Sequence, residues 1–275
     1  MVPVSFAPFD FAGEEWRMLD GRALFWPREN ALLVADLHLE KASFYAAAGQ
    51  MLPPYDSRET LERVALAIRA TGARRVFTLG DNFHDAGGPT RLEPHARGML
   101  DALTRTVDWV WITGNHDVKD GEAQAPGGTM LTELTTSGIV LRHKARTGEI
   151  RPELSGHFHP RLQITIRGRR IVRPCAVIAE TARPDEVARV DAVQADAVRA
   201  DAVRAEAGMG LENRAAGFAR SPCAGRMILP AFGALTAGMD ASDAAIREAM
   251  QPAAAIRAML PAAGRLLHFE LWRAA

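Results

Sequence analysis

Three short apolar segments of the chain each end abruptly in a cluster of polar residues, and a helical segment separates each from the next. Residues 31–35, 76–79 and 109–113 carry no charge and have the length and composition of buried strands. Strands that alternate with amphipathic helices usually pair in parallel and are covered by those helices. The carboxyl ends of such strands meet at one edge of the sheet, where sites form. The first half of the chain is therefore restricted to an α/β arrangement with its polar clusters at one edge.

The connecting segments and the second half of the chain predict further elements. A helix is expected over residues 57–70, with Asp56 and Glu59 as a capping box and Gly72 at its end. The stretch "RLEPHARGMLDALTRT" is also helical. Beyond about residue 135 the pattern changes to short strands, and "RGRR" predicts a hairpin turn between two alternating runs. Strand character resumes in "GRMILPAFGALTAG", followed by a helix in "SDAAIREAM" and a last strand in "LLHFELW". We expect a second sheet packed against the first.

Residues 181–224 differ in composition from the rest of the chain. They contain the pentad DAV(Q/R)A three times, with Val193, Val198 and Val203 five positions apart. Five residues advance a helix by about 500°, so these valines form no apolar stripe. We expect an inserted alanine-rich segment, exposed or disordered, within a single domain formed by residues 1–180 and 225–275. A partner-binding helix is the alternative.

Bulk properties limit the class of protein. The formal net charge is zero, so the molecule as a whole is not an obvious binder of polyanions. Two cysteines, Cys175 and Cys223, argue against a disulfide framework and for a reducing compartment. The N-terminus lacks the features of a signal peptide, and residues 227–239 are too short and too broken by proline and glycine to cross a bilayer. We expect a cytoplasmic protein without membrane contact.

The polar residues that follow the strands are of the types that bind metals. In chain order they are Asp36 and His38 ("ADLHLE"), Asp81 ("LGDNFHD"), Asn115, His116 and Asp117 ("TGNHD"), His143 ("LRHKA"), and His157 and His159 ("SGHFHP"). Imidazole nitrogens with carboxylate and amide oxygens suit Mn, Fe, Zn, Co or Ni, and suit neither Ca nor a cysteine-rich structural zinc. Any one of these motifs alone is usually a satisfied loop pair. Their joint occurrence after apolar strands predicts a metal site.

The motifs resemble those of the calcineurin-like metallophosphoesterases: D-x-H, G-D-x-x-D, G-N-H-D/E, a separate His, and G-H-x-H. One departure is that Asp85 lies one position late, with His84 before it. Over most of residues 25–235, stretches such as "ADLHLEKASFYAAAGQMLPPYDSRETLERV", "RRIVRPC" and "LPAFGALTAG" resemble the bacterial ligase-associated DNA-damage-response endonucleases, although residues 181–224 lie outside that pattern. The resemblance implies an α/β (α+β) fold, a two-sheet metallophosphoesterase β-sandwich flanked by helices. It places a dinuclear metal site at the carboxyl ends of the strands.

The same resemblance implies a role for each motif residue in a phosphodiesterase that uses two divalent ions, Mn²⁺ in the first place and Fe, Zn, Co or Ni as alternatives. One ion would bind Asp36, His38, Asp81 and His159, and the other would bind Asp81, Asn115, His143 and His157. A hydroxide bridging the metals would attack phosphorus. His116 would be the general acid to the leaving oxygen, and Asp117 would fix its tautomer, with a plain turn cap as the alternative for Asp117.

The substrate is less constrained by the sequence. Residues 142–173 hold nine basic side chains and two acidic ones and could contact the phosphates that flank a scissile diester, or could be solvated arginines on hairpin faces. His84 and Lys41 could also contact substrate phosphate. The sequence has no dense interleaving of aromatic and basic residues, and stacking on bases is a possibility that rests on Phe44, Tyr45, Tyr55 and Phe83 near the motifs.

Three functions compete. The first is a DNA endonuclease in repair, acting on single-stranded or looped DNA in association with a DNA ligase and a helicase. The second is a small-molecule phosphoesterase acting on nucleotides or on cyclic or dinucleotide diesters. The third is a non-catalytic interaction module, against which the complete ligand set and His116 argue.

Overall fold

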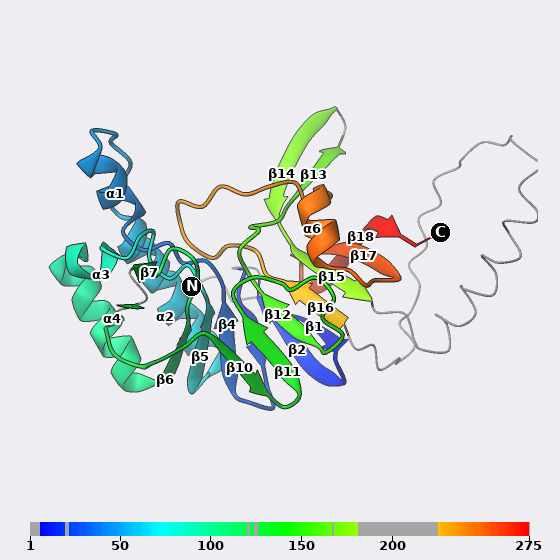
Figure 1. Ribbon diagram of the computed structural model, residues 1–275, viewed down its shortest axis with the longest axis horizontal. Helices are drawn as coiled ribbons and strands as arrows, with labels where there is room; N and C mark the ends of the chain where they lie inside the picture. Colours follow the sequence, from blue (N-terminus) through cyan, green and yellow to red (C-terminus); the bar gives the residue numbers. More distant parts are fainter. Residues whose placement is uncertain are drawn as a thin grey trace, which may run out of the picture.

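Two seven-stranded sheets stack face to face and carry helices on their outer faces (Figure 1). The computed structural model describes residues 6–19, 22–119, 122–123, 126–166, 168–180 and 225–274. The predicted α+β fold of two packed sheets flanked by helices is confirmed. The segment 181–224 lies outside the described residues, so its insertion and its repeats stay predictions. None of the helices in the described ranges is long and apolar enough to span a membrane.

The first sheet is mixed. Its order is β1 (Phe6–Phe11), β2 (Glu14–Leu19), β3 (Leu24–Trp26), β4 (Ala31–Val34), β5 (Arg75–Leu79), β6 (Asp108–Ile112) and β9 (Thr129–Leu131). The pairing from β4 through β9 is parallel, as the alternation of strands and helices predicts. Three antiparallel strands, β1 to β3, precede them and were not predicted. These strands are short, and the burial along β1 and β2 does not alternate strictly, so the pattern of a strand is weak there.

The second sheet has the order β10 (Glu133–Thr136), β11 (Ile139–Arg142), β12 (Glu153–Ser155), β16 (Gly225–Ile228), β15 (Ala176–Glu180), β17 (Ala255–Ala262) and β18 (Arg265–Arg273). Strands β15 and β16 pair antiparallel with Glu180 opposite Gly225. The two residues that flank segment 181–224 are therefore neighbours across one pair of strands. Two small hairpins complete the strands: β7 (Val118–Lys119) with β8 (Glu122–Ala123), and β13 (Arg161–Ile166) with β14 (Arg169–Pro174). The second hairpin confirms the turn predicted from "RGRR".

Each strand of the first sheet contributes to two cores because successive side chains point to opposite faces. Leu32 and Val34 pack with Trp109 beneath α2 (Asp56–Thr71) and α4 (Pro94–Thr106). Leu33 and Phe77 pack instead against the second sheet. A third cluster lies between the outer face of the second sheet and α6 (Ala244–Ala249). The strands that lead to the site are thus buried at their carboxyl ends.

Helix α2 matches the predicted helix, and Gly72, with φ 70°, ends it as expected. The predicted capping box is wrong. The N-cap residue is Tyr55, and no side chain caps the helix there. The Asp56 carboxylate accepts a hydrogen bond from the Ala42 N–H (3.1 Å) instead, so it ties α2 to the start of α1 (Lys41–Ala47). Glu59 forms an ion pair with Arg63 one turn later.

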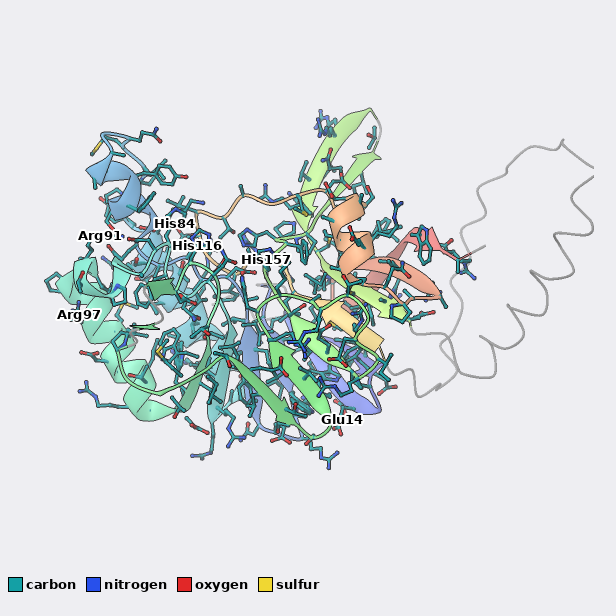
Figure 2. All side chains as sticks on the ribbon, in the orientation of Figure 1. Glu14, His84, Arg91, Arg97, His116 and His157 are labelled. Atoms are coloured by element: carbon teal, nitrogen blue, oxygen red, sulfur yellow. The ribbon has the colours of Figure 1, made fainter. Side chains whose placement is uncertain are left out.

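Two elements project from the sandwich at the upper edge in Figure 1: α1, and the β13–β14 hairpin. The loops that follow the parallel strands lie between them, and α3 (Gly88–Arg91) lies below α1 in this view. His84, His116 and His157 occupy this edge in Figure 2. The region that holds the predicted site therefore lies at the edge from which α1 and the hairpin project.

Candidate metal centre

The loops after five strands converge at the upper edge of the sandwich. In the first sheet, Asp36 follows β4, Asp81 follows β5 and Asn115 follows β6; in the second sheet, His143 follows β11, and His157 comes soon after β12. The loops after β4 and β5 stay paired through hydrogen bonds from the Asp36 N–H to Gly80 (3.1 Å) and from the His38 N–H to Asp81 (2.9 Å). Loops from both sheets thus come together in one region.

The predicted ligands form two groups that share one carboxylate. The ligand atoms of Asp36, His38, Asp81 and His159 all lie within 4.8 Å of one another, and so do those of Asp81, His143 and His157. The Asn115 Oδ1 lies 3.0 Å from the His143 Nε2, which adds the amide to the second group. The structure therefore brings together all seven predicted ligands, with Asp81 common to both groups. These clustered side chains could hold metal ions.

Hydrogen bonds at the far side of two imidazoles, those of His143 and His159, determine which nitrogen is available. A backbone carbonyl can only accept, so the Nδ1 of His143 donates to Leu79 (3.0 Å) and the Nδ1 of His159 donates to Ala237 (3.2 Å). The Nε2 of each ring then turns a lone pair toward the other ligands. For His143 those neighbours are Asn115 Oδ1 at 3.0 Å and Asp81 Oδ1 at 3.4 Å, which are themselves acceptors. Lone pairs that point at one another repel, and a cation bound between them removes the repulsion. This set of ligand atoms therefore fits a metal ion.

The pKa shifts of two imidazoles favour metal binding. Burial, followed by the nearby charges of His159 and His116, lowers the pKa of His38 to about 2. Burial and the neighbouring His143 lower the pKa of His157 to about 4. Both rings are therefore neutral near pH 7, which is the form that binds a metal. Burial raises the pKa of Asp81. At His159 burial lowers the pKa, but the Asp36 carboxylate outweighs it and the net shift is upward.

Five of the ligands have left-handed backbone conformations that non-glycine residues rarely adopt. The φ angles are 53° at Asp36, 44° at His38, 46° at Asp81, 73° at His157 and 48° at His159. Strained backbone of this kind is concentrated at functional sites. The sequence did not predict these left-handed conformations. Histidine and aspartate adopt them more often than most other non-glycine residues, which is consistent with their number here.

Three motif glycines lie against ligands. A Cβ on Gly80 would lie 2.2 Å from the His143 Nδ1, and a Cβ on Gly156 would lie 2.6 Å from the Asp36 Oδ2. On Gly114 it would lie 2.2 Å from the Asp81 backbone N and 2.3 Å from its Oδ1. The absence of a side chain at these positions allows the loops to approach closely enough to gather the ligands.

His116 lies beside the shared carboxylate but is only partly buried. Its Nε2 is 3.9 Å from the Asp81 Oδ2, and its Nδ1 donates to the backbone carbonyl of His84 (2.8 Å). The proton on Nδ1 leaves Nε2 as the atom that can give or take a proton at the site. This placement is compatible with the predicted general acid.

The predicted contact between Asp117 and His116 is wrong. The Asp117 carboxylate is buried and accepts three hydrogen bonds, from the Asn82 Nδ2 (2.9 Å), the Phe83 N–H (3.0 Å) and the Gly114 N–H (2.8 Å). No hydrogen bond or ion pair joins it to His116, whose tautomer is fixed by a carbonyl. Asp117 therefore holds the loops after β5 and β6 together, which is the alternative role of a turn cap.

Two structural partners of the site carried little signal in the sequence. Asn82 is buried, and its amide donates to the Ile112 carbonyl (2.9 Å) as well as to Asp117. The loop after β16 supplies the Ala237 carbonyl to His159, and Gly238 lies so close to the His159 carbonyl that a Cβ would come within 2.0 Å. The stretch "LPAFGALTAG" suggested this loop only through its resemblance to other sequences.

His84 and Lys41 flank the site. The Nδ1 of His84 lies 3.3 Å from the Nδ1 of His38, and its ring stacks on that of His116 with a centroid distance of 5.4 Å. Burial, followed by the charge of Lys41, lowers the pKa of His84 to about 4. Contact with a substrate phosphate stays a prediction for both residues. Asp85, the displaced acid, forms an ion pair with Arg91 and does not join the ligands.

The predicted basic stretch is only partly available. Arg142 is buried and pairs with Glu133 (3.0 Å), Glu149 (3.0 Å) and Glu153 (3.2 Å), so it cannot bind a phosphate on the surface. Arg146 and Arg151 are paired with the same group of acids. The described basic side chains that remain exposed on the β13–β14 hairpin are Arg169, Arg170 and Arg173. Sequence counting could not separate these sets because it does not show which charges are paired.

Comparison with known proteins supports the fold. No family model matches the chain, and no curated protein matches it. Among solved structures, the chain is similar to the crystal structure of Pseudomonas putida nuclease MPE, with 23% sequence identity and a TM-score of 0.59. The similarity covers 96% of this chain and 100% of that chain. The two proteins therefore share their fold over nearly their whole length.

Proposed function

We propose that this protein is a metal-dependent phosphodiesterase of the calcineurin-like type that cleaves nucleic acid. The observation that carries the proposal is the pair of ligand groups that share Asp81 at the meeting point of both sheets. The fold shared with a protein described as a nuclease supports the same class of reaction.

Different residues of the chain would have different roles in phosphodiester cleavage. Two divalent ions, with Mn²⁺ as the first choice, would be held by the two groups, and when bound such ions activate water and neutralise phosphoryl oxygens. Asn115 adds an oxygen without a charge, which keeps the site from repelling an anionic substrate. His116 is held by the His84 carbonyl with its Nε2 toward Asp81, so it can deliver a proton to the leaving oxygen.

The β13–β14 hairpin favours nucleic acid over a small diester. Residues 161–174 contain five arginines and no acid, and Arg169, Arg170 and Arg173 are exposed. The hairpin projects beside the site (Figure 1), where arginines could contact phosphates that flank the scissile bond. A small nucleotide or cyclic diester needs no such arm. Within the proposal the substrate is DNA, single-stranded or looped, and a role in repair alongside a DNA ligase and a helicase rests on the motif resemblance alone.

The test compares the wild-type protein with two variants after metal removal and reloading with Mn²⁺. Each protein receives circular single-stranded DNA in one reaction and a mixture of small diesters and nucleotides in another. We expect wild type to nick the circle. We expect His116→Ala to keep its metal and lose hydrolysis, and Asp81→Ala to lose both, as measured by metal analysis of the purified proteins.

The outcomes separate the alternatives. Turnover of small diesters without nicking would replace the nuclease by a small-molecule phosphoesterase that uses the same site. If the Asp81→Ala variant retained two ions, the proposal that Asp81 is a ligand of both ions would be contradicted. Absence of hydrolysis on every substrate, with both ions bound, would favour an interaction module.

A further inference from the structure

An uncharged, exposed segment projects beside the candidate site. Residues 44–55 ("FYAAAGQMLPPY") contain no charged side chain, and they include Phe44, Met51 and Tyr55, which are 41%, 85% and 66% exposed. We call this segment the aromatic arm. It includes most of α1, which stands away from the sandwich in Figure 1. Such an exposed apolar segment is a candidate binding surface.

The base of the arm is fixed, so its exposed position is built into the fold. Ser57 donates to the Glu40 carboxylate (2.8 Å) and accepts from the Glu40 N–H (2.8 Å), and all these groups are buried. Asp56 accepts from the Ala42 N–H (3.1 Å). The arm therefore leaves and re-enters the protein at a fixed pair of points, with its apolar side chains held in solvent.

Aromatic contacts connect the arm to the candidate catalytic residue. The rings of Phe44 and Tyr45 lie 4.9 Å and 5.5 Å from that of His84, measured between centroids. His84 in turn stacks on His116 at 5.4 Å with an interplanar angle of 18°. A row of flat rings thus leads from the arm to the side chain next to the shared carboxylate. Figure 2 shows His84 and His116 side by side below α1.

We propose that the aromatic arm is a platform on which an unpaired base next to the scissile phosphate stacks, with Phe44 and Tyr45 as its principal rings. The proposal rests on the nuclease function proposed above. Aromatic rings at the edge of a phosphate-cleaving site offer π-faces to a base, and every base can use them whatever its identity. The uncharged composition of the arm suits this part of the substrate, whereas the arginines of the β13–β14 hairpin suit phosphates.

A macromolecular partner is a weaker explanation of the same surface. Phe44 contacts His84, and His84 contacts both His38 and His116. A protein or a second copy of the chain seated on Phe44 would therefore lie against the ring that contacts both His38 and His116. A base of the substrate occupies the same place only when the phosphate is in the site. The platform also predicts a preference for single strands, because bases in a duplex are already stacked.

The test measures binding of oligonucleotides with and without bases. The Mn²⁺-loaded protein is titrated into a fluorescent thymidine oligomer of about 12 nucleotides, a length typical of single-strand binding sites, and into an abasic oligomer with the same number of phosphates. Phosphorothioate linkages in both oligomers resist hydrolysis. The variant is Phe44→Leu with Tyr45→Leu, which keeps apolar bulk and removes the flat rings. Leu267→Ala, an exposed apolar position on β18, is the matched control.

We expect the double variant to lose about 5- to 160-fold in affinity for the thymidine oligomer, the range found when alanine replaces a ring on which one base stacks. Its affinity for the abasic oligomer should stay within about twofold of wild type, since phosphate contacts are untouched. The control should match wild type on both. If the double variant proves unfolded by circular dichroism, the single Phe44→Leu change, at an exposed position, replaces it.

Three results would overturn the platform. An equal loss of affinity for both oligomers would mean that the aromatic arm stabilises the fold or contacts the phosphates. Unchanged affinity for both would mean that the arm binds something other than a base, such as a partner protein. Equal affinity of wild type for the two oligomers would show that bases are not bound. In all three cases nicking of DNA by wild type would leave the proposed function standing. A wild type that neither binds nor cleaves DNA would refute that function itself.

Discussion

Substitution of Gly114 by alanine tests how close packing of the loops positions the candidate ligands, because it changes no ligand itself. The added Cβ would lie 2.2 Å from the Asp81 backbone N, about 1.2 Å inside the 3.4 Å at which ordinary contact begins. The nearest atoms are the backbone and the carboxylate of Asp81, so no flexible side chain can move aside. Gly114 does not have a positive φ, so alanine brings no conformational penalty of its own. The variant changes no ligand and no charge.

The shift that the added Cβ imposes on Asp81 is large compared with the error in ligand position that a metal site tolerates. Ligand distances in metal sites hold to about 0.2 Å, so a shift of several tenths of an ångström at the shared carboxylate affects both ligand groups. Changes beside a metal ligand typically lower metal affinity about 10- to 100-fold, which corresponds to about 1.4 to 2.7 kcal/mol. Overpacking should also lower the free energy of unfolding by about 1 to 3 kcal/mol.

The assay is calorimetric titration of Mn²⁺ into metal-free protein, with thermal unfolding of the same samples. The matched control is Gly98→Ala: Gly98 is exposed within α4, and a Cβ there would meet nothing within 4 Å. Because glycine weakens a helix interior, the free energy of unfolding of this control should rise by about 0.5 to 1 kcal/mol. Its Mn²⁺ affinity should equal that of wild type. Mn²⁺ affinity of Gly114→Ala within about twofold of wild type would refute the reasoning, since the shared carboxylate would then not depend on the loop's close approach.

Four further predictions follow from other parts of the structure. Glu153→Ala removes one of the three carboxylates around buried Arg142 and the ion-pair partner of buried Arg226, and it should lower the free energy of unfolding in urea by about 3 to 5 kcal/mol; a loss below about 1 kcal/mol would contradict it. Arg151, through its side-chain hydrogen bond, lowers the pKa of Glu149, so the stability that Glu149 adds is present at neutral pH and is lost as pH falls through and below the ordinary Glu value of about 4.3. Glu149→Gln should therefore narrow the difference in urea midpoint between neutral and acidic pH, and an unchanged difference would count against the ion pair. Alanine at both Arg169 and Arg170 should reduce the slope of log affinity for single-stranded DNA against log salt by about 0.7 per lost phosphate contact, and an identical slope would exclude the hairpin as a contact. Deletion of residues 194–207 should leave diester hydrolysis within a few-fold, because Glu180 and Gly225 already pair across the ends of the segment; a collapse of activity in a folded variant would place the segment in the site.

The sequence predicted the convergence of the ligands because the relevant physics is local and repetitive. Residues 31–34 and 75–79 form parallel strands, so the polar residues after them must meet at one edge of the sheet. Asp36 and Asp81 were predictable for that reason. His157 and His159 come from the second sheet, and only their resemblance to a known motif placed them with the others.

The features that escaped prediction depend on contacts between distant parts of the chain. Arg142 lies next to His143 in a stretch rich in arginine, yet it is buried among three glutamates. Asp117 stands beside His116 in sequence, but the turn after β6 directs its carboxylate toward Asn82 and away from the imidazole. Neighbouring side chains on an irregular loop have no fixed angle between them, so adjacency could not decide either case.

The strained backbone of the ligands implies that the rest of the chain holds them in place. Left-handed conformations cost about 1 to 2 kcal/mol for each non-glycine residue, and five ligands adopt them. Hydrogen bonds to the carboxylates offset part of the cost: the His157 N–H donates to the Asp36 carboxylate (2.9 Å), and the His116 N–H donates to the Asp81 Oδ1 (3.0 Å). The carboxylates are therefore positioned by backbone donors as well as by any ion they bind. Metal affinity then depends on residues that touch no metal, which is why a change at Gly114 tests the site more sharply than removal of a ligand.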